Sequence, residues 1–252
     1  MKNLVEVKNL KKKYGFKEAV KGISFTIKEN EILGLLGPNG SGKTTTIGMM
    51  LGLLKPSNGE ILIDGKKIEE SRIETLQKIN FISPYIELPK KLTVKQNLIV
   101  YCKLYNVVNV KNRIDYLAEK LRLENLLNRV TGELSSGQKN RVSLAKALIN
   151  NPKVLFLDEP TASLDPEIGD FVRSFLENYK KEKKISILLA SHNMSEVTRL
   201  CKTVLMMKNG IIVDKGHPNE LIEKHGRKNL EEVFLKLTRE KLWISIECTD
   251  FF

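Results

Sequence analysis

Short apolar runs separated by polar turns fill the N-terminal part of the chain. Runs of this kind that end in glycine, asparagine or proline are typical of strands. We predict strands over Leu4–Leu10, Gly22–Ile27 and Glu31–Leu36, a hairpin over Gly59–Ile68 that turns on Asp64 and Gly65, and a further strand over residues 77–83. This part of the chain is therefore expected to be rich in β-structure.

The pattern becomes helical from about Thr93 to Asn150. Thr93 and Gln96 have the spacing of a capping box, in which each side chain binds the other residue's backbone N–H. Apolar residues then recur at intervals of three and four, as on one helical face, at Ile114, Leu117, Ala118 and Leu121. We therefore expect a helical insertion at about residues 85–151.

Two continuous apolar runs follow, and they are typical of buried strands: Val154–Leu157 and Ile185–Ala190. Between them, Asp165 is expected to cap a helix that has Pro166 in its first turn and lysines at its C-terminal end, where positive charge is favourable. A last helical face is formed by Leu230, Val233, Phe234 and Leu237, and the simplest expectation is that it docks on its own domain. Strands alternating with helices predict an α/β fold.

A glycine-rich stretch between the strand Glu31–Leu36 and the helix Thr44–Leu53 has the spacing of a phosphate-binding P-loop. Its glycines allow consecutive backbone N–H groups to turn toward a triphosphate, and the following helix N-terminus favours the same anion. Lys43 would neutralise the β- and γ-phosphate oxygens, and Thr44 would offer its hydroxyl to Mg²⁺. The stretch consists of Gly37, Pro38, Asn39, Gly40, Ser41, Gly42, Lys43 and Thr44.

Two carboxylates end the apolar strand that begins at Val154. In a P-loop protein, an acid at such a strand end can hold Mg²⁺, and the next acid can orient or deprotonate the attacking water. We assign the first role to Asp158 and the second to Glu159. Exposed loop acids are the alternative, but the large apolar residues that lead directly into the pair argue against it.

Three further positions carry a functional hypothesis beside a structural one. Ser135 is a plausible N-cap, and with Gly137 it would also make a second anion site. His192 directly follows a buried strand, where it would face the γ-phosphate. Tyr14, between the first two predicted strands, offers a flat face to an adenine ring, although taken alone it also fits ordinary packing.

Composition restricts the class of protein. The 252 residues suit one large α/β domain, and 42 Lys and Arg against 30 Asp and Glu give a net charge of +12, compatible with nucleic acid or an anionic membrane surface. Cys102, Cys201 and Cys248 lack paired spacing, so neither a disulfide framework nor a zinc site is predicted. We expect a protein of the cytoplasm, without a signal segment or membrane span.

The P-loop, the strand-end acids, the histidine and the segment Leu134-Ser135-Ser136-Gly137-Gln138 occur in the order found in ABC-type ATPases, which the chain resembles over roughly residues 4–216. The resemblance implies a P-loop NTPase core with a mixed central sheet, an N-terminal antiparallel β subdomain and a helical insertion. It also implies an ABC-type nucleotide-binding domain at residues 1–216, followed by a C-terminal helical extension and tail at residues 217–252. The role of the tail at residues 241–252 is not predicted.

The resemblance also assigns roles to residues. In ABC proteins two domains meet head to tail, so Ser135, Ser136, Gly137 and Gln138 would contact the ATP of a partner subunit. Tyr14 would stack on adenine, His192 would brace the γ-phosphate and the water, and Asp165 would lie at the dimer seam. The expected ATP-binding residues are Tyr14, the P-loop and Thr45, with ATP and Mg²⁺ as ligands.

The sequence departs from the family pattern in two places. Ser136 replaces the first glycine of the commonest signature, and because serine keeps the backbone N–H we expect little loss. Where the family usually places a glutamine that touches Mg²⁺ and senses the membrane partner, this chain has Ile82-Ser83-Pro84-Tyr85. Ser83, Tyr85 or Glu87 would substitute, or the coupling is arranged differently.

The first functional hypothesis is the ATPase subunit of a membrane transporter, most plausibly an exporter. It would work as a head-to-tail homodimer, or paired with a similar subunit, on the cytoplasmic face of the membrane through a separate integral membrane permease. The direction of transport rests on the C-terminal helix, which looks like the end of drug- and polysaccharide-export ATPase subunits.

Two alternatives stay open. An ABC ATPase acting on nucleic acid or the ribosome is permitted by the charge. Its usual forms carry a long heptad insertion or two ATPase domains, and neither fits this chain. An ATP-gated regulatory subunit with slow turnover is suggested by the missing glutamine.

Overall fold

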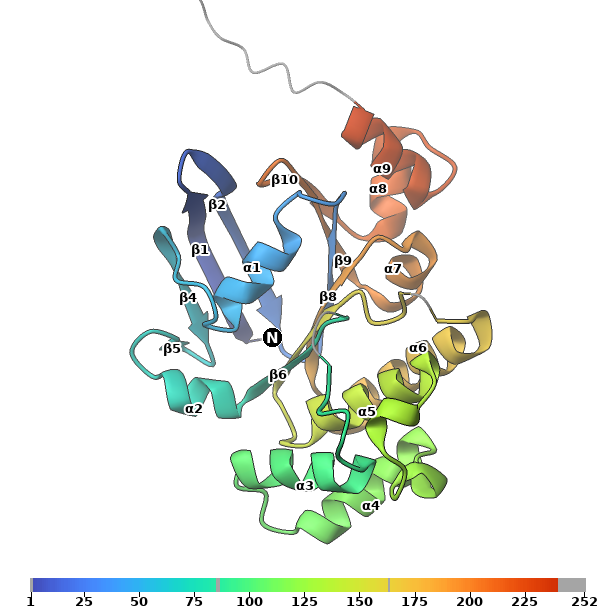
Figure 1. The fold of residues 1–252 in the computed structure, drawn as a ribbon. Coiled ribbons are helices and arrows are strands. Elements are labelled where there is room, and N and C mark those ends of the chain that lie inside the picture. Colours follow the sequence, from blue (N-terminus) through green and yellow to red (C-terminus); the bar gives the residue numbers. More distant parts are fainter. Residues whose placement is uncertain (1, 85–86, 163, 240–252) are drawn as a thin grey trace, which may run out of the picture.

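The computed structural model describes residues 2–84, 87–162 and 164–239. Helices surround two β-sheets, and a helical region extends from one end of the molecule (Figure 1). The strands of the first sheet are β1 (Asn3–Tyr14), β2 (Lys17–Lys28), β4 (Asn58–Ile63) and β5 (Lys66–Lys67). The strands of the second are β3 (Ile32–Leu36), β6 (Ile79–Ile82), β7 (Val154–Asp158), β8 (Ser186–Ser191), β9 (Thr203–Lys208) and β10 (Ile211–Gly216).

The first sheet has the order β2-β1-β4-β5 and is antiparallel. Strands β1 and β2 are longer than the apolar runs that predicted them. Their lysine-rich outer halves are held by cross-strand pairing, which apolar periodicity does not report. Tyr14, expected between these strands, is instead the last residue of β1 and pairs with Lys17. The predicted hairpin at Asp64 and Gly65 is present between β4 and β5.

The second sheet has the order β10-β9-β3-β8-β7-β6, and all of its strand pairs are parallel except that of β9 with β10. Strands β3, β7 and β8 are buried along their whole length. The continuous apolar runs come from this burial on both faces.

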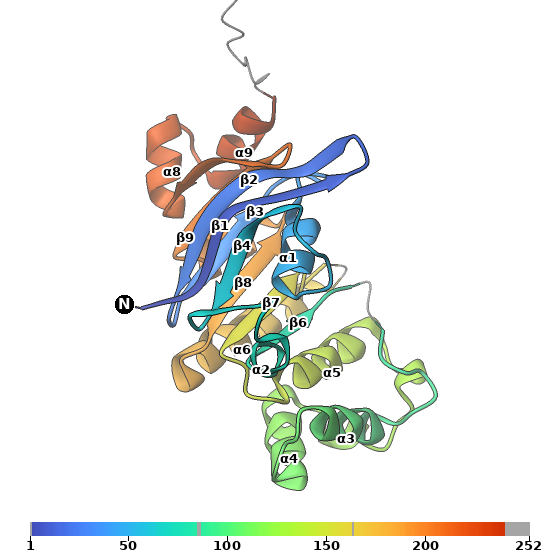
Figure 2. The ribbon, with the colours of Figure 1, turned by 90° about the vertical axis from the view of Figure 1, so that its left-hand side faces the viewer.

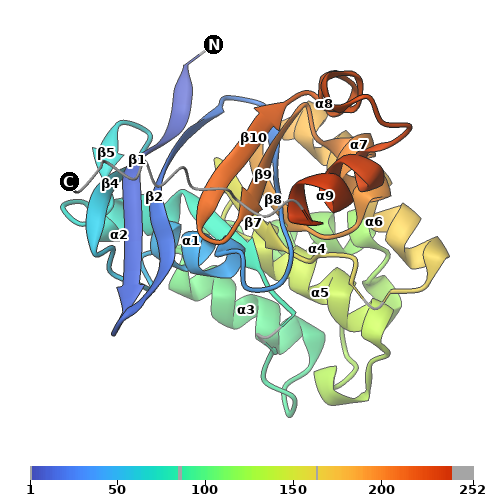
Figure 3. The ribbon, with the colours of Figure 1, turned by 90° about the horizontal axis from the view of Figure 1, so that it is seen from above.

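The helices cover the two faces of the second sheet. Helix α1 lies between the two sheets, and its Ile47, Met49 and Met50 belong to a core shared by both (Figure 2). The opposite face is covered by a second core that includes residues of α3 to α9 (Figure 3). The helices are α1 (Lys43–Met50), α2 (Arg72–Gln77), α3 (Val94–Leu104), α4 (Val110–Leu121), α5 (Ser136–Leu148), α6 (Pro166–Lys183), α7 (Met194–Leu200), α8 (Pro218–His225) and α9 (Leu230–Arg239).

The helical insertion forms as the sequence pattern predicts. Thr93 and Gln96 make both bonds of the capping box at the start of α3. The α4 residues expected on one face, Ile114, Leu117, Ala118 and Leu121, are all buried. In the C-terminal helix α9, Leu230 and Val233 are buried against the same core, so this helix docks on its own domain.

The order of strands in the second sheet determines where the candidate functional residues meet. Because β8 lies between β3 and β7 and all three are parallel, the segments after their carboxyl ends meet at one edge of the sheet. These segments are the P-loop, the residue pair Asp158-Glu159 and His192. Sequence segments more than a hundred residues apart in the chain therefore form one site.

Candidate active site

The P-loop joins β3 to α1 and encloses the side chain of Lys43. Its ammonium donates to the carbonyl oxygens of Gly37 at 2.6 Å and Pro38 at 3.3 Å. Gly37 has no room for a side chain, because a Cβ there would lie 2.4 Å from the carbonyl oxygen of Met207. Burial lowers the pKa of Lys43, while nearby Glu159 and Asp158 oppose that shift. A buried cation is thus held where a phosphate group would lie against α1.

A hydroxyl and a carboxylate meet beside this lysine. Thr44 donates its hydroxyl to Asp158 Oδ2 at 3.2 Å. Asp158 is only 4% exposed, and burial raises the pKa of its carboxyl, with the nearby charge of Glu159 acting in the same direction. Two hard oxygen donors at this spacing suit Mg²⁺, whose remaining ligands are usually water and phosphate oxygen. Among the described residues, no cluster of three or more histidine, cysteine or acidic side chains forms a metal cage.

Glu159 and His192 form a pair across β7 and β8. The Glu159 carboxylate lies 2.7 Å from His192 Nδ1, and the same oxygen is 3.4 Å from the His192 backbone N–H. Glu159 has a φ of +51°, an uncommon left-handed conformation for a residue with a side chain. Its own N–H donates to the Ala190 carbonyl at 2.8 Å, which fixes this conformation against β8. Backbone strain held in place by a neighbouring strand is typical of functional sites.

An open cleft of about 980 Å³ adjoins the P-loop at the tip of the β1–β2 hairpin. Its lining brings Tyr14 together with the P-loop residues Asn39, Gly40 and Gly42. Tyr14 is 47% exposed, and the ammonium of Lys12 lies 5.1 Å from the centre of its ring. The cleft also includes Lys43, Thr44, Thr45 and the fully exposed Phe16. Its size and its aromatic wall suit a nucleotide.

The start of helix α5 carries the segment from Ser135 to Gln138. Ser135 Oγ accepts the Gln138 N–H at 3.3 Å, and the Ser135 N–H donates to Gln138 Oε1 at 3.0 Å, so the predicted cap is confirmed and forms a capping box. Ser135 and Ser136 are exposed, whereas Gly137 is buried against Ile168 of α6. None of Ser135, Ser136, Gly137 and Gln138 is among the residues that line the cleft beside the P-loop.

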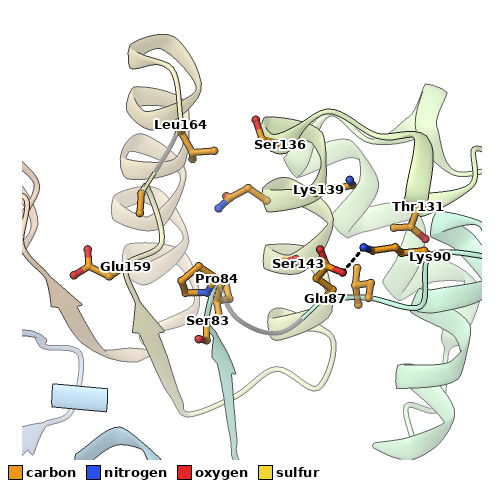
Figure 4. A pocket seen from close by; sticks show the side chains of 14 residues that line it. Ser83, Pro84, Glu87, Lys90, Thr131, Ser136, Lys139, Ser143, Glu159 and Leu164 are labelled. Atoms are coloured by element: carbon orange, nitrogen blue, oxygen red, sulfur yellow. Dashed lines mark ion pairs between the residues drawn. The ribbon is translucent and has the colours of Figure 1, made fainter. Parts of the chain in front are cut away.

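A second cavity, of about 210 Å³, lies between the end of β6, the start of α5 and the segment after β7 (Figure 4). Ser83, Ser136, Lys139 and Glu159 are among the residues that line it. Glu87 also lines it and forms an ion pair with Lys90 at 2.7 Å. Tyr85, another candidate for the missing glutamine, lies outside the described residues, and that position stays unassigned.

The remaining predicted residues have separate places. Asp165 caps α6 by accepting a hydrogen bond from the Ile168 N–H at 3.0 Å, and it is exposed, as a residue at a subunit seam would be. Ser163, which precedes it in the motif, and the tail at residues 241–252 with Cys248 lie outside the described residues. Cys102 and Cys201 are free and buried. In the part of the chain that the structure describes, no helix has the length and apolar character of a membrane span.

Comparison with known proteins settles the family. A model of the ABC transporter family matches residues 20–162. The Nod factor export ATP-binding protein I of Burkholderia orbicola is 36% identical over 232 residues, which cover 91% of this chain and 76% of that protein. The ABC transporter ATP-binding protein NatA of Bacillus subtilis is 36% identical over 226 residues, covering 88% of this chain and 92% of that protein. The chain belongs to the ABC transporter family.

Solved structures agree with this assignment. An ATP-binding subunit of an ABC transporter superposes with a TM-score of 0.85 at 27% identity, covering 93% of this chain and 99% of that one. A dimeric ABC cassette in a post-hydrolysis state with ADP and phosphate superposes with a TM-score of 0.77 at 27% identity, covering 84% of this chain and 98% of that one. The predicted fold, the ABC-type ATPase activity and the binding of ATP are therefore confirmed.

Sequence reasoning missed some residues that lie at this candidate site. Phe16 lines the same cleft as Tyr14. An aromatic residue among polar residues at a hairpin tip is the sequence feature that could have identified it. Asn140 of α5 donates to the Pro160 carbonyl at 2.7 Å and so joins the signature helix to the segment after Glu159. Glu196 of α7 accepts hydrogen bonds from Thr161 and Ser191, in the segments at the ends of β7 and β8. No local sequence pattern predicts such a contact.

Proposed function

We propose that this ABC ATPase powers export across a membrane through a separate permease subunit. Two chains would bind two ATP molecules head to tail, on the cytoplasmic face of the membrane. The proposal is supported by the named export function of a relative and by the exposed Ser135 and Ser136, which do not line the cleft beside the P-loop of their own chain. Residues 1–216 would form the nucleotide-binding domain, with the helical insertion at about 85–151 and an extension at 217–252.

The observation that carries the catalytic assignment is the Glu159–His192 pair beside the P-loop. Tyr14 would stack on adenine, while the P-loop N–H groups and Lys43 would hold the phosphates. Thr44 and Asp158 would hold Mg²⁺, which supplies charge neutralisation at the β- and γ-phosphate oxygens. Because Glu159 directly follows the proposed Mg²⁺ ligand Asp158, its carboxylate would take a proton from the attacking water.

His192 and the partner subunit would complete the arrangement. The imidazole lies against the Glu159 carboxylate and is itself 65% exposed, so one edge would orient the glutamate while the other would face the γ-phosphate. Ser135 and Gly137 of a second copy would contact the same γ-phosphate from the opposite side, and Asp165 would lie at the seam between the two copies. Closing the pair would exclude water other than the nucleophile and would move the permease.

The test is Glu159→Gln in the purified full chain. General-base assistance is worth about 10²–10⁴-fold, so phosphate release should fall by that factor while ATP binding persists. Because the closed pair would then not hydrolyse its ATP, Mg²⁺ and ATP should convert the variant from monomer to dimer in light scattering.

A matched control is Glu60→Gln, at an exposed glutamate paired with Lys8 and Lys67 on the first sheet. It should hydrolyse ATP at the rate of the parent chain. Undiminished phosphate release from Glu159→Gln would remove Glu159 from the role of general base. A Glu159→Gln chain that binds ATP but stays monomeric would refute the head-to-tail pair.

A further inference from the structure

Helix α7 buries a carboxylate that the proposed chemistry does not use. Glu196 is 0% exposed and lies on the short helix that follows His192. Burial raises the pKa of this carboxyl, and hydroxyl donors together with the charge of Arg173 oppose the shift. Burying such a group costs several kcal/mol when it lacks partners, so its hydrogen bonds should have a specific role.

Those partners belong to two separate strand-end segments. Oε1 of Glu196 accepts the hydroxyl of Thr161 at 2.9 Å, and Oε2 accepts the hydroxyl of Ser191 at 2.8 Å. Thr161 is two residues beyond Glu159, and Ser191 immediately precedes His192. One carboxylate therefore ties together the two segments whose ends meet at the 2.7 Å Glu159–His192 contact.

The turn between β8 and α7 is closed by further hydrogen bonds. Ser191 Oγ also accepts the Asn193 N–H at 3.0 Å, and Asn193 Oδ1 accepts the Glu196 N–H at 3.2 Å. Glu196 therefore anchors the backbone on both sides of His192. A polar network whose members all have partners fixes one geometry, whereas apolar packing at the same place would tolerate several.

We propose that Glu196 is a positioning residue that sets the register between Glu159 and His192. The inference rests on the catalytic roles proposed above for those two residues. Glu196 would not touch ATP or water, so it would affect the alignment of the chemical step and leave nucleotide binding unchanged. A shift of about 1 Å between reacting groups can cost on the order of 10²-fold in rate.

The first test is Glu196→Gln, which keeps the shape of the side chain and replaces one acceptor oxygen with a donor NH₂. We expect kcat for ATP hydrolysis to fall by about 10- to 100-fold, with KM for ATP and the Kd of a fluorescent ATP analogue unchanged. The matched control is Glu177→Gln, at a half-buried glutamate of α6 that pairs with Arg199 of α7. It should keep kcat within about twofold.

Thr161 provides a second test that does not depend on the folding of Glu196→Gln. Thr161→Val removes the hydroxyl at nearly constant shape and should lower kcat. Thr161→Ser keeps a hydroxyl at this position and should have a kcat close to that of the parent chain. If Thr161→Val and Thr161→Ser have equal kcat, the bond to Glu196 does not position the site and the proposal is wrong. A fall of both kcat and ATP affinity in Glu196→Gln would also overturn it, because that pattern indicates general disruption.

A double variant separates this inference from the function on which it rests. If Glu196 acts through Glu159, adding Glu196→Gln to Glu159→Gln should slow phosphate release by less than about twofold more. Full additivity of the two losses would contradict the positioning role. Normal turnover in Glu159→Gln alone would instead refute the catalytic assignment of Glu159, whatever Glu196→Gln does.

Discussion

The P-loop and the start of helix α5, both proposed above to bind phosphate, differ in how their own chain surrounds them. Lys43 is 6% exposed and Asp158 is 4% exposed, and each is held by named partners within the chain. Ser135 and Ser136 are exposed, and neither lines the cleft beside the P-loop. The chain itself therefore holds the side chains of the first region in place, whereas those of the second are open to solvent. This difference supports the composite site proposed above.

The largest expected effect comes from the buried region. Replacing the ammonium in Lys43→Met removes the charge that the P-loop encloses, and we expect ATP hydrolysis to fall by about 10³-fold. Steady-state phosphate release measures this. The same chain keeps its Ser135 end intact, so mixing it with the parent chain should give mixed pairs that retain one working site. At a parent concentration too low for parent chains to pair with one another, an excess of Lys43→Met should therefore raise phosphate release per parent chain, and an unchanged rate would contradict a composite site.

The next effect concerns the exposed region. Ser135→Arg places a long side chain where the partner's phosphate would lie, and turnover should fall by about 100-fold while ATP binding to the single chain is unchanged. Thr93→Arg is a matched control, because Thr93 caps α3 with the same capping-box geometry. Both variants lose a cap worth about 1 kcal/mol, but only Ser135→Arg should lose activity. Equal turnover in the two would show that the segment is merely a helix cap.

A smaller effect is expected from the aromatic wall of the cleft. Tyr14→Ala should weaken ATP binding by about 5- to 150-fold, because base stacking on an aromatic ring is worth about 1–3 kcal/mol. Tyr14→Phe should retain the affinity, and kcat should change little in either. Titration with a fluorescent ATP analogue measures the Kd. Unchanged affinity in Tyr14→Ala together with a loss in Phe16→Ala would move the stacking role to Phe16.

The smallest effect tests how firmly α5 is anchored on its inner side. Lys146 lies over the rings of Phe81 and Tyr101, and burial lowers its pKa to about 8 from the ordinary value of 10.5. Between these values the unfolded chain binds more protons than the folded chain, so this group's contribution to stability rises with pH.

Urea unfolding at pH 8 and pH 9 measures that contribution. The parent chain should gain about 1 kcal/mol relative to Lys146→Met over this interval. The comparison with the variant cancels the surface lysines, some of which have a raised pKa and act in the opposite direction. If the free energy of unfolding has the same pH dependence in the parent chain and in Lys146→Met, Lys146 has an ordinary pKa and its ammonium is solvated.

Features controlled by local backbone chemistry were predictable from the sequence. The P-loop glycines, the capping boxes of Thr93 and Ser135 and the cap at Asp165 depend on residues only a few positions apart, so their spacing determines them. The buried strands β7 and β8 were equally clear, because burial on both faces requires a continuous apolar run. The family resemblance then extended these local signals to a function.

Only the tertiary structure decided which strands and which side chains are neighbours. Strand β8 lies between β3 and β7, and this order places His192 against Glu159, although neither residue encodes the order. The outer halves of β1 and β2 are strands because they pair with each other, and Glu196 acquires its partners from two distant segments. Contacts of this kind depend on the packing of the whole chain, so spacing along the sequence does not reveal them.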